Sequence, residues 1–75
     1  MNVLKIFSET NIDKEELKAL LRGKRINYYS VKDALYLMSY RTNEIGLKRL
    51  LAAINEIEIY LLQELYPPEE EEGIE

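Results

Sequence analysis

The feature of this sequence that most constrains its fold is a long apolar stripe between residues 43 and 66. Its members recur every three or four positions, as they do in helices that pack along their whole length. They are Leu47, Leu50, Ile54, Ile57 and Leu61. This spacing predicts one helix over 43–66, about 36 Å long at ~1.5 Å per residue. Pro67 and Pro68 end it, because proline cannot continue a helix.

Two shorter amphipathic segments precede this stripe. Asp13 and Glu16 have the spacing of a capping box before a cluster of leucines, which predicts a helix over 13–22. A second helix is predicted over 31–40, capped by Ser30, because its apolar residues fall at positions i, i+3, i+4 and i+7. These residues are Val31, Ala34, Leu35 and Met38.

The two ends of the chain differ from this helical pattern. Residues 2–7 are interpreted as a short strand or an extended arm, although their alternation of apolar and polar residues is imperfect. The expected fold is therefore mainly α, with three helices and an N-terminal strand as an option. One domain is expected over residues 1–66, and the acidic residues 67–75 are predicted to be a disordered tail.

The long stripe also predicts a homodimer. Two helices of about ten residues cannot cover a rod of this length, and a core of about 65 residues is marginal by itself. The predicted dimer interface contains Leu47, Leu50, Ile54, Ile57, Glu58, Leu61 and Leu65. In the alternative, the stripe is the internal core of a monomer, and Glu58 lies at the edge of that core.

Composition excludes several kinds of chemistry. The chain has 75 residues with no Cys and no His, which removes disulfide frameworks, zinc fingers and His-based catalysis. We expect no enzymatic activity, no metal and no cofactor. No apolar run approaches the ~20 residues of a membrane span, and no secretory signal is recognised, so a cytoplasmic protein without a membrane partner is expected. The abundance of Ile, Leu, Glu and Tyr is similar to that of heat-adapted proteins.

Charge is unevenly placed along the chain. The net charge is −4, but all ten Lys and Arg residues lie within residues 1–50, together with six acids. Residues 51–75 carry eight acids and no base. An acidic total therefore does not exclude nucleic-acid binding by the first part of the chain. In the alternative, these cations are an ordinary solvated surface.

The segment containing the second and third predicted helices is compatible with a helix-turn-helix. Arg41, Asn43, Lys48 and Arg49 would then lie at the mouth of the second helix, where Asn and Arg can contact base edges. The turn of this motif usually contains a glycine, whereas Gly46 lies inside the helix here. A ribbon-helix-helix dimer that uses residues 2–7 as its ribbon is a further alternative.

A second cluster of basic residues lies between the first two predicted helices. Arg22, Lys24 and Arg25 can neutralise phosphates, and Tyr28 and Tyr29 follow as stacking platforms. In the alternative, this is a flexible loop whose tyrosine rings fill the core. Two functions are therefore expected: a homodimeric DNA-binding regulator, or a non-enzymatic adaptor or inhibitor that acts through the long helix and the acidic tail.

Overall fold

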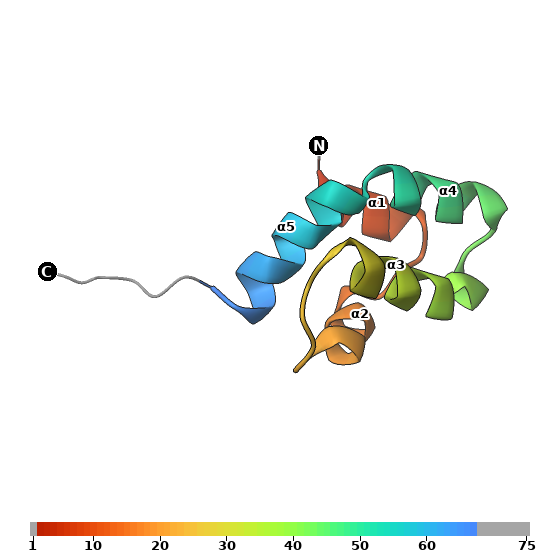
Figure 1. The fold of residues 1–75 in the computed structure, drawn as a ribbon. Coiled ribbons are helices and arrows are strands. Elements are labelled where there is room, and N and C mark those ends of the chain that lie inside the picture. The colour runs from red at the N-terminus through yellow and green to blue at the C-terminus, as the bar shows by residue number, and fades with distance from the viewer. Residues whose placement is uncertain (1, 68–75) are drawn as a thin grey trace, which may run out of the picture.

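The computed structural model describes residues 2–67 of the chain, and that part is mainly helical (Figure 1). The mainly α fold is therefore confirmed, but five α-helices and one short 3-10 helix replace the three helices that were predicted. They are α1 (Val3–Glu9), α2 (Lys14–Leu21), α3 (Tyr28–Leu37), η1 (Ser39–Arg41), α4 (Glu44–Ala52) and α5 (Ile54–Leu65). The predicted acidic tail lies outside the described residues, apart from Pro67.

The prediction of a strand at residues 2–7 is wrong, because these residues form α1. The Asn2 side chain accepts a hydrogen bond from the backbone N–H of Lys5 at 3.2 Å and so caps the helix. Val3, Ile6 and Phe7 then have the i, i+3, i+4 spacing of a helix face, and the last two are buried. The edge-to-face contact between Phe7 and Tyr60, with ring centroids 5.6 Å apart, fixes α1 on α5.

The two middle helices form close to where the sequence placed them. Asp13 caps α2 by accepting a hydrogen bond from the backbone N–H of Glu15 at 2.9 Å. The predicted start of α3 is three residues late, because Asn27 rather than Ser30 is the cap. Asn27 and Ser30 exchange hydrogen bonds between side chain and backbone at 2.9 and 3.0 Å, which is a complete capping box.

The predicted helix over 43–66 is interrupted at Ala53. This residue has φ −105° and ψ 20°, outside the helical range, and it separates α4 from α5. The two helices meet at a clear angle in Figure 1. The Ala53 side chain is buried, and its small size lets the chain turn against the core. A rod that bends in this way can cover its own apolar stripe.

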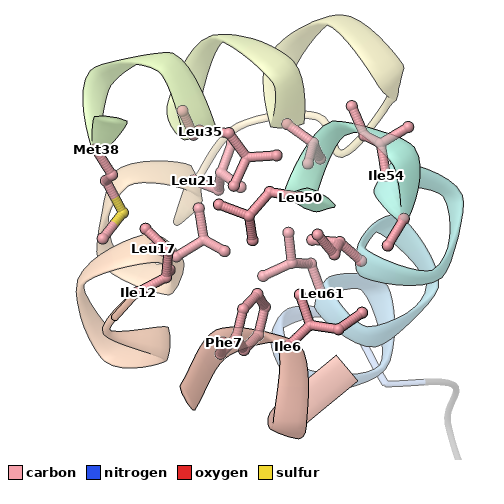
Figure 2. Packing of buried hydrophobic residues seen from close by; sticks show 14 residues of the cluster. Ile6, Phe7, Ile12, Leu17, Leu21, Leu35, Met38, Leu50, Ile54 and Leu61 are labelled. Atoms are coloured by element: carbon pink, nitrogen blue, oxygen red, sulfur yellow. The ribbon is translucent and has the colours of Figure 1, made fainter. Parts of the chain in front are cut away.

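The core is built from all five α-helices (Figure 2). Its residues are Ile6, Phe7, Ile12, Leu17, Leu21, Val31, Ala34, Leu35, Met38, Leu50, Ala53, Ile54, Ile57 and Leu61. Leu50, Ile54, Ile57 and Leu61 were expected at the dimer interface, but each is at most 6% exposed within one chain. Leu47, Glu58 and Leu65 are half-buried. Homodimerisation stays a prediction, and it would need other side chains than the four core residues.

Candidate nucleic-acid interface

Half of the ten cationic side chains form ion pairs within the described residues. These five are Lys5, Lys18, Arg41, Lys48 and Arg49. The five for which residues 2–67 provide no ion-pair partner are Lys14, Arg22, Lys24, Arg25 and Lys32. Four of these five lie between residues 22 and 32, a stretch that contains no acid. The unpaired positive charge is therefore concentrated at the α2–α3 connection.

The residues predicted to contact bases at the start of α4 are already engaged. Arg41 donates to one Glu16 carboxylate oxygen from Nε at 2.8 Å, and its Nη2 lies 2.7 Å from the same oxygen. Arg49 donates to Glu9 at 2.6 Å. Asn43 accepts a hydrogen bond from the backbone N–H of Gly46 at 2.7 Å and thereby caps α4.

Two further observations concern the first turns of α4. Lys48 forms an exposed i, i+4 pair with Glu44 at 3.8 Å. A Cβ atom at residue 46 would collide with the Thr42 side chain, so the close approach of the turn to α4 explains Gly46. The structure therefore does not leave Arg41, Asn43, Lys48 and Arg49 as one open contact surface.

The pair between Arg49 and Glu9 has a measurable consequence. The Arg49 guanidinium, which donates a hydrogen bond to Glu9, holds the pKa of that carboxyl below its usual value of 4.5. Because the folded-state pKa is depressed, the pair stabilises the fold above the unfolded-state pKa, and this contribution is lost as pH falls through the folded-state pKa. We expect the NMR titration midpoint of Glu9 to lie below 4.5 and to rise in Arg49→Gln.

Lys48→Gln is the matched control for that titration, since it removes a cation of α4 that pairs with Glu44 instead. It should leave the Glu9 midpoint in place. A midpoint that does not move in Arg49→Gln would contradict the assignment of the shift to this guanidinium.

Two tyrosines at the start of α3 directly follow the cations of the α2–α3 connection. We call Arg22, Lys24, Arg25, Tyr28, Tyr29 and Lys32 the basic-aromatic surface. Tyr28 is 43% and Tyr29 is 73% exposed, so these rings do not fill the core, and that alternative is wrong. The Lys32 Nζ lies 5.4 Å from the Tyr28 ring centroid, a cation–π contact that keeps charge and ring together.

Backbone contacts hold this loop in a defined conformation. The Tyr66 hydroxyl, just beyond α5, accepts from the Gly23 N–H and donates to the Lys24 carbonyl, both at 3.1 Å. The Ser30 hydroxyl donates to the Arg25 carbonyl at 2.6 Å. Gly23 has φ +81°, a conformation that glycine adopts without strain. These contacts use main-chain atoms, so the basic side chains remain available to a ligand.

A second surface feature lies between α1 and α5. Asn2, Val3 and Leu4 of the α1 region face Ile59 and Tyr60 of α5 across an open hollow of about 680 Å³. Leu4 is 48% and Ile59 is 56% exposed. Among the described residues, Glu56 is the only charged one that lines the hollow. Apolar exposure of this kind suits contact with another protein.

Comparison with protein families, with curated proteins and with solved structures gave no match. Among residues 2–67, no group of acidic side chains has the arrangement needed to hold a metal ion. In the same part of the chain, no helix has the length and apolar character that crossing a bilayer requires.

Proposed function

We propose that this chain is a non-catalytic nucleic-acid-binding protein and that its contact surface is the basic-aromatic surface. The observation that carries the proposal is a stretch of eleven residues, 22–32, with four cations that form no ion pair in the described residues and two exposed tyrosines, one of which contacts Lys32. Phosphate contacts supply most of the affinity of such proteins, and aromatic rings add stacking. The proposal thus places the nucleic-acid contacts at the α2–α3 connection rather than at the start of α4.

The cost of separating existing ion pairs favours this location over the start of α4. Exposed ion pairs contribute only about 0–1 kcal/mol each, so Arg41 and Arg49 could leave their carboxylates for a phosphate. Each exchange would nevertheless leave Glu16 or Glu9 close to the incoming phosphate, and the like charges would repel. Arg22, Lys24 and Arg25 form no ion pair within residues 2–67, and the carboxylate that lines a hollow together with Lys24 is that of Asp33. They therefore bind an anion without losing an existing partner.

Local charge supports the same conclusion. Residues 2–67 contain ten basic and nine acidic residues, so this part of the chain is nearly neutral as a whole. Residues 22–32 are an exception, because they contain four cations and no acid, and Asp33 follows directly after them. A concentrated patch of charge attracts a polyanion even where the total charge is small.

The proposal is tested by fluorescence anisotropy of labelled mixed-sequence oligonucleotides titrated with the full chain at 50 and 200 mM salt. If all four cations contact phosphates, the affinity should fall roughly 50- to 150-fold between the two salt concentrations. Lys14→Ala is the control, since Lys14 is exposed and unpaired but begins α2, at the far end from the loop. That variant should bind like the parent protein. Absence of binding at both salt concentrations would refute the proposal.

The apolar hollow between α1 and α5 favours a second candidate function, contact with a protein partner or with a second copy of the chain. Its exposed Leu4 and Ile59 are the side chains that such a contact would bury. Sedimentation equilibrium of the parent protein and of Ile59→Lys tests self-association. A substitution there should leave oligonucleotide affinity unchanged, because the hollow is formed by α1 and α5 rather than by the α2–α3 connection.

A further inference from the structure

We infer that the ligand of the basic-aromatic surface is single-stranded nucleic acid, with bases stacked on Tyr28 and Tyr29 and phosphates held by the surrounding cations. This inference rests on the proposed function and specifies its ligand class. Its basis is the nearly perpendicular arrangement of the two rings, on which the parallel bases of a duplex cannot both stack.

Tyr29 provides an accessible stacking ring. It is 73% exposed, more than any other large apolar or aromatic residue within residues 2–67. No hydrogen bond of its hydroxyl occurs in the described structure, and its ring contact there is the edge-to-face contact with Tyr28. An aromatic ring left in water has no structural role in the core, whereas a base stacked on it would bury the ring.

The relative orientation of the two rings favours a single strand over a duplex as the ligand. Their centroids are 5.2 Å apart and their planes are inclined by 87°. Successive bases in a duplex are parallel and closely stacked, so they cannot lie on two perpendicular rings at once. Bases of a single strand can be splayed apart, and each can then stack on its own ring. A duplex would also cover both faces of each base with its neighbours, leaving only base edges for a protein.

The cations lie on both sides of the rings along the chain. Arg22, Lys24 and Arg25 precede the tyrosines, and Lys32 follows them one turn later on α3. The Lys32 amine lies over one face of Tyr28, so a base stacks on the other face of that ring or displaces the amine, and in both cases a charge is close to the base. A strand whose bases lie on the rings therefore has the Lys32 amine close by for a phosphate, and it can reach the other three cations by following the connection back towards α2.

The inference is tested by comparing a labelled mixed-sequence single strand with its own duplex, at equal length and at 50 mM salt. We expect the single strand to bind more tightly. Tyr29→Ala should weaken binding of the single strand roughly 5- to 150-fold, the usual effect of removing one stacking ring. Tyr29→Phe retains the ring and should bind like the parent protein. Because Tyr29 is exposed, the folding of both variants can be verified by circular dichroism.

Tyr40→Ala is the matched control for ring removal. Tyr40 is 69% exposed, but it lies beyond the other end of α3, where its hydroxyl donates to Glu16 at 2.9 Å. The guanidinium beside its ring belongs to Arg41, which is paired. This variant should leave single-strand affinity unchanged.

Different results would contradict the single-strand inference and the proposal of nucleic-acid binding itself. Salt-dependent binding in which the duplex is preferred, or in which Tyr29→Ala changes nothing, would overturn the single-strand inference and leave nucleic-acid binding intact. Absence of binding to either oligonucleotide would overturn both. Loss of affinity in Tyr29→Ala that Tyr29→Phe shares would show that the hydroxyl matters rather than the ring, and would also overturn stacking.

Discussion

Replacing Arg22, Lys24 and Arg25 together by alanine is expected to reduce single-strand affinity on the order of a hundredfold at 50 mM salt. The slope of log affinity against log salt should change from roughly −2.8 to roughly −0.7, because three of four phosphate contacts are removed. The fold should be unaffected. The carbonyls of Lys24 and Arg25 accept hydrogen bonds from Tyr66 and Ser30, and these main-chain contacts remain in the variant. Anisotropy at four or more salt concentrations measures both quantities.

A second triple variant controls for net charge. Lys5→Ala, Lys14→Ala and Lys48→Ala remove the same number of cations from positions on α1, α2 and α4. The Lys5 and Lys48 side chains are 71% and 75% exposed, and each has at most a weak pair on its own helix. This variant should retain most of the affinity and the original salt slope. Equal losses in the two triple variants would show that total charge, rather than the basic-aromatic surface, determines binding.

The parts of the fold that the sequence predicted well are those determined by neighbouring residues. Asp13 caps α2 as expected, because a cap and its helix lie within one turn of each other. The basic-aromatic surface could also be recognised, since its six residues lie within one short stretch of the chain. What the sequence could not indicate was whether the tyrosines point inward or outward. Their exposure depends on how α3 packs against α5 and α2.

The cations of the predicted helix-turn-helix show which contacts a local pattern does not contain. Arg41 pairs with Glu16, 25 positions earlier, and Arg49 pairs with Glu9, 40 positions earlier. No spacing rule connects residues so far apart. Both carboxylates looked like ordinary surface acids in the sequence, and only the packing of α1 and α2 brings them to these guanidiniums. Which cations are paired is therefore a property of tertiary structure.

The strand predicted at residues 2–7 and the unbroken helix over 43–66 failed for a related reason. A helix of seven residues has little stability of its own, so α1 depends on packing that a local pattern does not contain. A repeat of apolar residues every three or four positions is equally compatible with a straight rod and with two helices joined at Ala53. With the bend, Leu50, Ile54, Ile57 and Leu61 join the core of the same chain, so a dimer is no longer needed to bury these four residues.

Replacing Leu50 by alanine should therefore destabilise the isolated chain severely. Leu50 is fully buried and lies among residues from several helices in Figure 2. Leu→Ala substitutions at such positions cost about 2–5 kcal/mol, and a domain of this size rarely has more than about 3–5 kcal/mol of stability. We expect Leu50→Ala to be largely unfolded at 25 °C by circular dichroism. Ile57→Val, also fully buried, removes a single methylene and should lower the free energy of unfolding by about 0.5–1.5 kcal/mol, which urea titration can measure.

Two controls distinguish an internal core from a dimer interface. Ile59→Ala removes an apolar side chain from the same part of the chain, but Ile59 is 56% exposed, so the change in stability should be within about 0.5 kcal/mol. If Leu50, Ile54, Ile57 and Leu61 form the core of one chain, the urea midpoint of the parent protein should not depend on protein concentration. An obligate dimer sealed by these residues would instead unfold at a higher midpoint as concentration rises, because association stabilises the folded state by mass action. A midpoint that rises over a hundredfold range of concentration equally in the parent protein and in Ile59→Lys would contradict the monomeric core and restore the dimer predicted from the stripe, whereas a rise that Ile59→Lys abolishes would indicate association through the hollow.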